Sequence, residues 1–264
     1  MSGEFRGKSV IVTGGLSGIG LATVRAFMLR GALVFMTGRS EERARTAIAD
    51  LPNGPGTVEF LPLDVRDEAN VASVFESIDG RTGGRLDVAV CNAGVNAPGY
   101  VPDISCEEFD RCIDTNLKGV FLVAREAITR MRSSGGGSVV TVSSNGGLIA
   151  RAADPVYCAS KAAVIMLTKA MAIAHGAENI RVNSVCPGPV GDTDMVARAL
   201  AAAPDPARAA EEQLAAAPLA RAAGRMIRSE EVAELIVFLC SENAAMVTGA
   251  AVPIDAGKSA GIRR

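Results

Sequence analysis

Short runs of apolar, mostly β-branched residues alternate with longer segments of helical pattern over the whole chain. The runs are almost continuously apolar rather than alternating, which is typical of strands buried on both faces of a parallel sheet. They lie at residues 10–12, 33–36, 57–63, 88–91, 138–142, 180–185 and 251–254. The helical patterns lie at 18–30, 41–51, from 67 onward, and at 107–131, 156–175 and 230–239. This order predicts the α/β class, with a doubly wound parallel sheet of about seven strands, right-handed crossovers and helices on both faces.

The chain shows no internal repeat and no linker that would divide it. Its 264 residues, 48% of them hydrophobic, can bury one substantial core, and single α/β domains of ~250 residues are common. We therefore expect a single domain over 1–264. Residues 195–225 differ from the rest, because they are rich in alanine, carry three prolines and lack a strand pattern. Disorder is one interpretation. We prefer a helical lid at about 190–226, since a regular pattern resumes after it.

The composition argues against several classes of function. A net charge of −2 provides no basic excess for a phosphate backbone, so we expect no nucleic-acid partner. His175 is the only histidine, and no cysteines form a C-x-x-C pair. A metal site or a histidine-based triad is therefore not expected. His175 itself fits a residue at a helix end beside Gly176.

Cysteine usage and the N-terminus bear on the compartment. Most of the six cysteines lie in apolar runs and are interpreted as reduced, buried thiols: Cys91, Cys106, Cys112, Cys158, Cys186 and Cys240. The N-terminus has no apolar signal core. No apolar stretch approaches the ~18 residues of a membrane span. We therefore expect a cytoplasmic protein with no membrane partner.

A glycine-rich turn, residues 13–20, follows the first predicted strand and opens the first helix, with the spacing G-x-x-x-G-x-G. An α/β sheet binds a dinucleotide pyrophosphate at this position, because glycines let the backbone approach the phosphates and the helix N-terminus supplies oriented N–H groups. A tight structural turn is the alternative. The position of the turn between strand and helix favours cofactor binding.

The second predicted strand ends in Arg39 where an NAD site usually has an acidic residue for the ribose 2′-hydroxyl. Arginine can pair with a 2′-phosphate through charge-assisted hydrogen bonds. We therefore predict that NADP(H) is favoured over NAD(H). The alternative is that Arg39 is solvent-exposed and drawn away by Glu41 and Glu42, in which case NAD(H) remains possible.

Tyr157 and Lys161 are four residues apart in a helical pattern and share one helix face. A free tyrosine has a pKa of ~10 and is a poor acid–base catalyst near neutrality. A neighbouring cation lowers that pKa, which suits the protonation of a carbonyl oxygen as hydride arrives. A half-buried tyrosine beside a snorkelling lysine would give the same spacing.

Polar residues follow three further predicted strands, at 92–94, 143–145 and 187–188. The carboxyl ends of parallel strands form the usual ligand side of such a sheet. Any one of these groups could be ordinary turn chemistry. Their joint placement favours a binding site, in which a serine hydroxyl would hold the substrate oxygen and an asparagine a water molecule.

Taken together, these motifs resemble the short-chain dehydrogenase/reductase family, in the branch with chains of ~250 residues and a Rossmann-type fold. The resemblance runs from about Lys8 to Gly257. The motifs that carry it are T-G-x-x-x-G-I-G at 13–20, Asp64 after the third strand, N-A-G at 92–94, Asn116, Ser144, Tyr157 with Lys161, and Pro187-Gly188. Ser144 is chosen over Ser143 because it lies thirteen residues before Tyr157, the usual gap in the family.

The resemblance implies four catalytic residues in a dinucleotide-binding catalytic domain. Tyr157 would act as general acid in reduction and base in oxidation. Lys161 would lower the pKa of Tyr157 and bind the nicotinamide ribose. Ser144 would orient the substrate carbonyl, and Asn116 would hold a water molecule in a proton relay.

The resemblance also implies a set of cofactor contacts. Asp64 would contact the adenine, Asn92 the adenosine side, and Ile19 the pyrophosphate and nicotinamide region. Val190 and Thr193 would cover the nicotinamide amide, although the segment 187–193 is one residue longer than the usual P-G-x-V-x-T. The predicted cofactor-binding residues are Gly14, Ser17, Gly18, Ile19, Gly20, Arg39, Asp64, Val65, Asn92, Ala93, Gly94, Tyr157, Lys161, Pro187, Gly188, Val190 and Thr193.

The leading functional prediction is an NADP(H)-favouring oxidoreductase that interconverts a secondary alcohol and a carbonyl of a small-molecule substrate. One alternative is an NAD-dependent dehydrogenase of a hydroxyl or dihydrodiol. Another is a non-catalytic NADP-binding regulatory module, which the presence of all four catalytic residues disfavours. The pocket is expected at 96–100, 146–154 and the lid. The resemblance also implies that the helices at 107–131 and 156–175 pair between subunits, giving a homotetramer or possibly a dimer.

Overall fold

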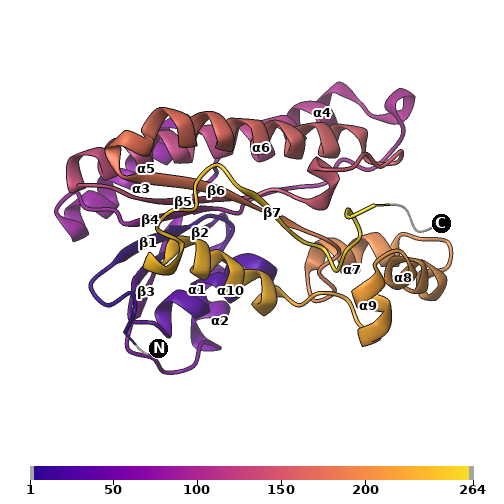
Figure 1. The fold of residues 1–264 in the computed structure, drawn as a ribbon, viewed down its shortest axis with the longest axis horizontal. Helices are drawn as coiled ribbons and strands as arrows, with labels where there is room; N and C mark the ends of the chain where they lie inside the picture. The colour runs from indigo at the N-terminus through magenta and orange to yellow at the C-terminus, as the bar shows by residue number, and fades with distance from the viewer. Residues whose placement is uncertain (1–2, 262–264) are drawn as a thin grey trace.

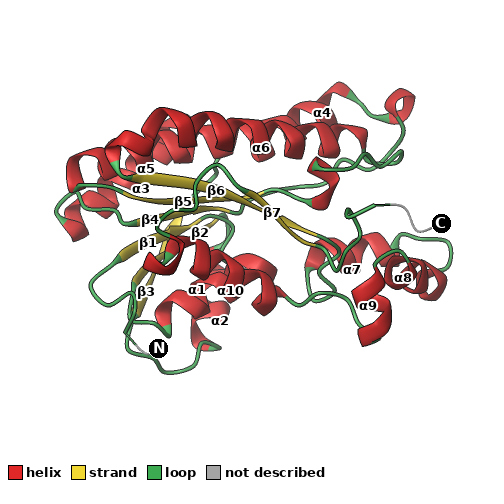
Figure 2. Cartoon of the chain, viewed as in Figure 1, coloured by secondary structure: helices red, strands yellow, loops and turns green. Residues whose placement is uncertain are grey.

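A computed structural model describes residues 3–261, and its centre is one sheet of seven parallel strands. The strands follow the order β3-β2-β1-β4-β5-β6-β7. Their bounds are β1 Ser9–Val12, β2 Leu33–Gly38, β3 Thr57–Pro62, β4 Val88–Cys91, β5 Gly137–Val142, β6 Ile180–Pro187 and β7 Ala251–Ile254. Figure 2 shows the strands as one layer between two layers of helices. The predicted α/β doubly wound fold is confirmed.

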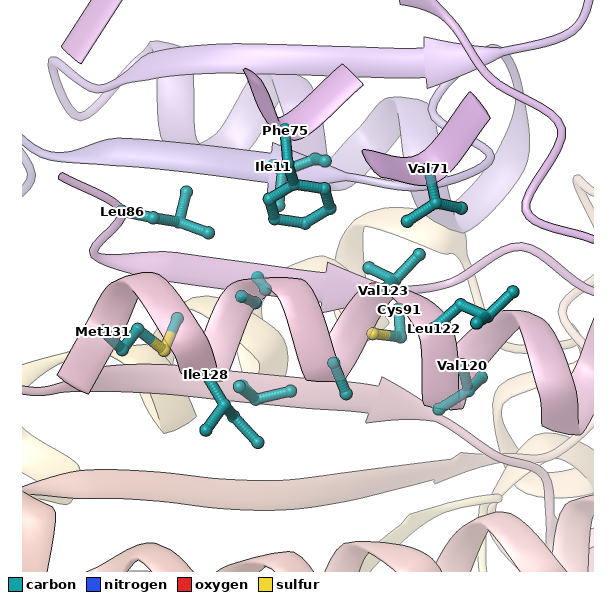
Figure 3. Close-up of a cluster of buried hydrophobic side chains, with 14 of the residues drawn as sticks. Ile11, Val71, Phe75, Leu86, Cys91, Val120, Leu122, Val123, Ile128 and Met131 are labelled. Carbon is teal, nitrogen blue, oxygen red and sulfur yellow. The ribbon is translucent and has the colours of Figure 1, made fainter. Parts of the chain in front are cut away.

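Helices cover both faces of the sheet, as the continuously apolar strands require. One face carries α3 Glu68–Thr82, α4 Cys106–Ile113, α5 Gly119–Ser134 and α6 Pro155–His175. The other face carries α1 Gly18–Met28, α2 Glu41–Ala49 and α10 Ser229–Cys240 (Figure 1). Two buried apolar clusters result, one on each side. Figure 3 shows the first, in which Phe75 lies beside Ile11 between sheet and helices and Met131 belongs to the same cluster.

The chain changes direction across the sheet between β1 and β4. β1 pairs with β2 on one side and with β4 on the other, where Val12 lies opposite Val90. The loops after these two strands therefore lead away from each other and leave a crevice at the carboxyl edge of the sheet. Ligands of open α/β sheets bind at this kind of switch point.

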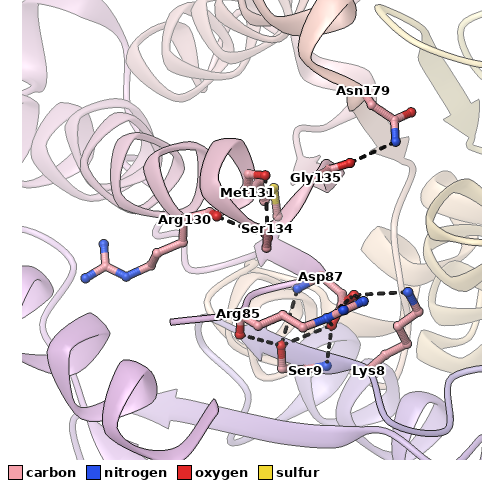
Figure 4. A network of polar contacts seen from close by, with 9 residues as sticks. All are labelled: Lys8, Ser9, Arg85, Asp87, Arg130, Met131, Ser134, Gly135 and Asn179. Carbon is pink, nitrogen blue, oxygen red and sulfur yellow. Dashed lines mark hydrogen bonds and ion pairs between the residues drawn. The ribbon is translucent and has the colours of Figure 1, made fainter. Parts of the chain in front are cut away.

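The opposite, amino-terminal edge of the sheet is fixed by a polar network centred on Asp87 (Figure 4). Its carboxylate accepts hydrogen bonds from Lys8 Nζ at 3.0 Å, from the Ser9 backbone N–H at 3.0 Å and from Arg85 NH2 at 2.7 Å. Burial raises the pKa of Asp87, but these donors outweigh it and hold that pKa below its usual range. The network ties β1 to β4 and lies away from the ligand edge, so we interpret it as structural.

The predicted long helix at 107–131 is interrupted. α4 ends at Ile113, a π-turn spans Asp114–Lys118, and α5 begins at Gly119. The side chain of Asn116, at the centre of the turn, is fully buried and bonded to neighbouring segments. Those bonds hold the backbone off the regular helical path, and π-turns inside α-helices are frequent at functional sites.

The segment between β6 and α10 is helical. It forms α7 Asp194–Ala201, α8 Pro206–Ala215 and α9 Pro218–Ala223. Proline stands in the first turn of α8 and of α9, where its missing N–H costs nothing. Figure 1 shows these helices beyond the carboxyl ends of β6 and β7, with the segment after β7 beside them.

The expectation about apolar stretches needs a correction. The stretch Pro155–Glu178, which comprises α6 and the short turn after it, is long and apolar enough by composition to cross a membrane. Half of its most apolar window is buried inside the fold, and α6 carries Tyr157 and Lys161 on its buried side. This is the pattern of a core helix, whose length and apolar character serve its packing against the sheet.

Candidate active site

The glycine turn after β1 is shaped by positions that exclude a side chain. Gly14 and Gly18 have φ values of 65° and 51°, in the left-handed region that favours glycine. A Cβ on Gly20 would lie 2.1 Å from the carbonyl oxygen of Gly14. Ser17, the N-cap of α1, makes no side-chain cap within residues 3–261, and no acidic residue occupies the first turn. The amide groups at this helix end therefore suit a pyrophosphate.

Asn92 and Thr13 join this turn to the end of β4. Asn92 Nδ2 donates to the carbonyl oxygens of Thr13 at 2.9 Å and Gly14 at 3.1 Å. The backbone N–H groups of Asn92 and Ala93 both donate to Thr13 Oγ1, at 2.9 and 3.1 Å. The side chain of Asn92 thus fixes the shape of the turn. Thr13 belongs to the recognised motif but was missing from the predicted site residues, because its contribution lies in these tertiary hydrogen bonds.

Arg39 borders an open depression of about 350 Å³ after β2 and β3. The depression is lined by Arg39, Pro62, Leu63, Asp64 and Asn70. Arg39 is exposed and forms no hydrogen bond or ion pair with any residue between 3 and 261. Glu41 and Glu42 therefore do not hold it, and its guanidinium is available to a ligand.

Asp64 lies in the same depression but is paired with Arg66, which the sequence analysis did not single out. Arg66 Nε donates to Asp64 Oδ1 at 2.9 Å and Arg66 NH2 to Oδ2 at 2.6 Å. The hydrogen bond from Arg66 is the main influence holding the pKa of Asp64 below its usual range, and Arg39 adds to it. Val65, next in sequence, is buried and packs near Gly119.

Tyr157 stands near the start of α6 and is 6% exposed. Burial raises the pKa of its hydroxyl, while a hydrogen bond with Ser144 and the charge of Arg151 act in the opposite direction. The carbon of the Arg151 guanidinium lies 5.2 Å from the centre of the tyrosine ring. Tyr157 and Ser144, predicted from sequence, are therefore brought together.

Lys161 lies one turn further along α6 and is 3% exposed. Its Nζ donates to the carbonyl oxygen of Val142 at 2.8 Å and lies 5.7 Å from the centre of the Tyr157 ring. Burial lowers the pKa of Lys161 to about 8. Around the hydroxyl of Tyr157, Ser144 and Arg151 lower its pKa, and burial outweighs them both.

The two adjacent serines after β5 have different partners. Ser143 Oγ donates to the carbonyl oxygen of Lys161 at 2.8 Å, so its hydroxyl is used to hold α6 against β5. Ser144 Oγ accepts from the Gly146 backbone N–H at 3.0 Å and lies against Tyr157. The geometry supports the choice of Ser144 over Ser143.

Both polar atoms of the Asn116 side chain form hydrogen bonds. Its Oδ1 accepts from the Val95 backbone N–H at 2.8 Å, and its Nδ2 donates to Val95 O at 2.9 Å and to Ser160 Oγ at 3.0 Å. A Cβ on Gly94 would lie 3.3 Å from both Asn116 Oδ1 and Lys161 Nζ. Gly94 therefore leaves space beside these two polar atoms, and the amide of Asn116 anchors the π-turn to the end of β4.

The segment after β6 folds back over the glycine turn. Gly188 has no room for a side chain, since a Cβ there would lie 2.9 Å from Asp255 Cα. Val190 is buried and forms an isolated bridge with Ile227. Thr193 caps α7 by accepting from Val196 N at 3.4 Å, and its methyl carbon would contact any Cβ on Gly18. Val190 and Thr193 thus lie in the segment over the turn, with the hydroxyl of Thr193 used in the cap.

Thiols and metal-binding groups add no second centre. All six cysteines are free, and Cys106 alone among them is exposed. Within residues 3–261, no group of three or more His, Cys, Asp or Glu side chains has the arrangement needed to hold a metal ion. The polar side chains gathered at the site carry hydroxyl, ammonium, amide and guanidinium groups.

Comparisons with known proteins agree with this geometry. A family model described as enoyl-(acyl carrier protein) reductase matches residues 14–259. An uncharacterised oxidoreductase of Thermotoga maritima is 36% identical over 257 residues, covering 97% of this chain and 99% of the relative. A cyclopentanol dehydrogenase of a Comamonas species is 38% identical over 258 residues, covering 98% and 99%.

A solved structure shares the fold over almost its full length. The short-chain type dehydrogenase/reductase from Mycobacterium marinum superposes with a TM-score of 0.87 at 34% identity, covering 96% of each chain. With the site described above, these relatives show that the chain belongs to the short-chain dehydrogenase/reductase family, whose enzymes act on CH–OH groups with NAD(P) as hydride acceptor.

Proposed function

We propose that this enzyme interconverts a secondary alcohol and a carbonyl with NADP(H) as the favoured cofactor and Tyr157 as the proton donor and acceptor. The observation that carries the proposal is the meeting of Tyr157, Ser144 and Lys161 at the carboxyl edge of the sheet. They lie beyond a glycine turn that suits a pyrophosphate. A relative named for cyclopentanol supports a small alcohol as substrate.

The chain's own groups divide the work in reduction. The nicotinamide cofactor supplies hydride to the carbonyl carbon. Ser144 holds the carbonyl oxygen, and Tyr157 gives that oxygen the proton, so the alcohol forms and a phenolate remains. The charge of Lys161 stabilises that phenolate at 5.7 Å from the ring centre. In oxidation the same tyrosine takes the proton back.

The remaining groups position cofactor and substrate. Asn116 keeps the π-turn against β4, which leaves space at Gly94 beside Lys161 where a water molecule could join the proton relay. Gly14, Ser17, Gly18, Ile19 and Gly20 would hold the pyrophosphate. Asp64, Val65, Asn92 and Ala93 would border the adenosine. Pro187, Gly188, Val190 and Thr193 would cover the nicotinamide, and α7–α9 would close over the substrate as a lid.

Exchanging Arg39 for aspartate is expected to reverse the cofactor preference. Arg39 is free to pair with a 2′-phosphate, whereas a carboxylate would repel the phosphate and accept from a 2′-hydroxyl. We expect kcat/KM for NADPH to fall about a hundredfold and that for NADH to rise. Initial rates with both cofactors on one ketone measure the ratio. Arg43→Asp, on the next helical turn, is the control, and an unchanged ratio in Arg39→Asp would refute the NADP(H) preference.

A homotetramer is the proposed assembly, and a dimer the alternative. Large apolar side chains are exposed on the outer surface of α4–α6, including Phe109 at 47%, Met166 at 63% and Ile173 at 86%. A second exposed group lies near α10 and β7, with Phe238 at 45% and Met246 at 96%. Two apolar faces on one subunit suit two interfaces. Light scattering after size exclusion should give four times the chain mass; a monomer would contradict the assembly.

We also propose a cytoplasmic location, which the six free cysteines support because reduced thiols persist there. The reaction class is tested by following NADPH and NADH consumption over ketones, aldehydes and 3-oxoacyl thioesters. Cofactor oxidation that requires Tyr157 would support the proposal. Bound cofactor without turnover in either direction would favour the non-catalytic alternative. Turnover with NAD⁺ and alcohols alone would favour the NAD-dependent dehydrogenase.

A further inference from the structure

Arg151 lies over the proposed general acid with its hydrogen-bonding capacity unused. It follows β5 in the loop that leads to α6 and stacks 5.2 Å from the ring centre of Tyr157. A Cβ on Gly146 would lie 2.9 Å from Arg151 NH2, so the absence of a side chain at Gly146 lets the guanidinium settle there. The side chain is one-third exposed. It is thus held in place by packing while facing the site.

The guanidinium of Arg151 donates no hydrogen bond to any residue from 3 to 261, and its Nε is buried without a partner. The nearest anion, Asp154, lies 3.4 Å from that nitrogen as an ion pair without hydrogen-bond geometry. Burial raises the pKa of the Asp154 carboxyl above its usual value, because it outweighs the opposing effect of the Arg151 charge. A buried donor with no partner is costly unless a ligand completes it.

A second buried donor without a partner belongs to the same loop after β5. Asn145, next to Ser144, is 2% exposed and its Nδ2 has no partner among the described residues. Its Oδ1 lies 3.4 Å from Ser144 Oγ. Both nitrogens are enclosed by protein atoms, so a ligand would meet the terminal nitrogens of the one-third-exposed Arg151 side chain.

Lys258 brings another cation to the same region. It follows β7, is half-buried, and donates to Gln213 Oε1 of α8 at 3.0 Å. Burial and the charge of Arg151 lower the pKa of Lys258. The charge of Asp255 raises that pKa but is outweighed. The carboxylate of Asp255 is itself engaged by the backbone N–H groups of Gly257 and Ser259. The charge of Arg151 thus reaches Lys258, which adds a second cation to the surroundings of Arg151.

We propose that the substrate is an oxo acid or hydroxy acid whose carboxylate binds Arg151. A carboxylate matches the planar donor fork of arginine. Because Arg151 lies against the Tyr157 ring, the carboxylate must be only a few bonds from the reacting carbonyl. This inference rests on the proposed alcohol–carbonyl reaction and names the substrate class for it.

The test compares acids with matched neutral compounds. Oxo acids with one to four methylene groups between carbonyl and carboxylate are assayed beside their methyl esters, in wild type and Arg151→Met. We expect wild type to prefer one acid over its ester, and Arg151→Met to lower kcat/KM for that acid about a hundredfold. The loss with the ester should be at least about tenfold smaller, because it reflects only the influence of Arg151 on Tyr157. Arg81→Met removes a cation of α3 that pairs with Glu59 and should change neither rate.

Other outcomes distinguish a failure of the carboxylate site from a failure of the proposed alcohol–carbonyl reaction. Equal use of acids and esters by wild type would overturn the carboxylate site and leave the reaction class intact. Equal losses on both in Arg151→Met would also overturn it, since Arg151 would then act only through Tyr157. Calorimetric titration of the protein–NADP⁺ complex with cyclohexanecarboxylate and its amide needs no turnover. Weaker acid binding in Arg151→Met supports the site even if no ketone is reduced, whereas equal binding of acid and amide by wild type refutes it.

Discussion

Replacing Tyr157 by phenylalanine is expected to reduce kcat by about a thousandfold or more while leaving NADPH bound. The substitution removes one hydroxyl from a side chain that is 6% exposed, so the ring still fills its place beside Arg151. What is lost is the proton donor in contact with Ser144. General acid–base catalysis by a positioned side chain contributes about 10²–10⁴-fold, and no other acid among the described residues lies at that hydroxyl.

The measurement is NADPH oxidation at saturating ketone, with cofactor binding followed separately by fluorescence. Tyr100→Phe is the matched control, because Tyr100 is the only other tyrosine and is 59% exposed. Residue 100 belongs to the expected pocket, so the comparison is made on kcat, which this variant should retain. A Tyr157→Phe enzyme within tenfold of wild type would show that the proton comes from elsewhere. Burial raises the pKa of the hydroxyl, so reduction should persist at alkaline pH until the tyrosine loses its proton, while oxidation should improve over that range.

Replacing Lys161 by methionine is expected to lower kcat/KM by about a hundredfold or more and to stabilise the protein. Burial moves the pKa of Lys161 from 10.5 to about 8, which corresponds to about 3 kcal/mol of free energy spent on burying the ammonium at neutral pH. Methionine has a similar shape and no charge. The carbonyl oxygen of Val142 loses its hydrogen-bond donor, which offsets about 1 kcal/mol of the stabilisation gained by removing the buried charge. A net rise of about 1–2 kcal/mol in unfolding free energy remains.

The lowered pKa of Lys161 also makes the unfolding free energy depend on pH in a defined direction. Between pH 8 and 10.5 the unfolded chain binds a proton on Lys161 that the folded protein has released. The unfolding free energy of wild type should therefore rise with pH across that window, and the contribution should be absent in Lys161→Met. Urea denaturation at pH 7 and pH 10 measures both proteins. Lys169→Met, on the same helix, is the control. A destabilised Lys161→Met protein would contradict the cost assigned to the buried charge.

The sheet was predictable because the apolar runs have the length and composition that a doubly buried strand requires. The observed strands begin and end within a few residues of the predicted ones, since each is bounded by glycine, proline or charged residues. The helices α8 and α9 were anticipated as helical from an alanine-rich sequence, and each begins at a proline. These features depend on local sequence alone.

The π-turn was not predictable, because Asp114–Lys118 contains no residue that forbids an ordinary helix. Its cause is tertiary: the amide of Asn116 bonds to the backbone of Val95, twenty-one residues away. The pairing of Asp64 with Arg66 and the position of Arg151 over Tyr157 likewise depend on side-chain directions that only the fold determines. The sequence identified 146–154 as pocket-forming but did not distinguish Arg151 within it.

The change of direction between β1 and β4 divides the site into two contiguous blocks of chain. Groups for the adenosine and pyrophosphate precede Val95, and the proposed catalytic groups, the expected pocket and the lid follow it. The contacts of Asn116 across the boundary use only the backbone of Val95, so they tolerate other side chains there. Recombination between relatives within 95–105 should therefore yield chimeras that inherit coenzyme choice from one parent and substrate choice from the other. In evolution, the two specificities could have been shuffled independently.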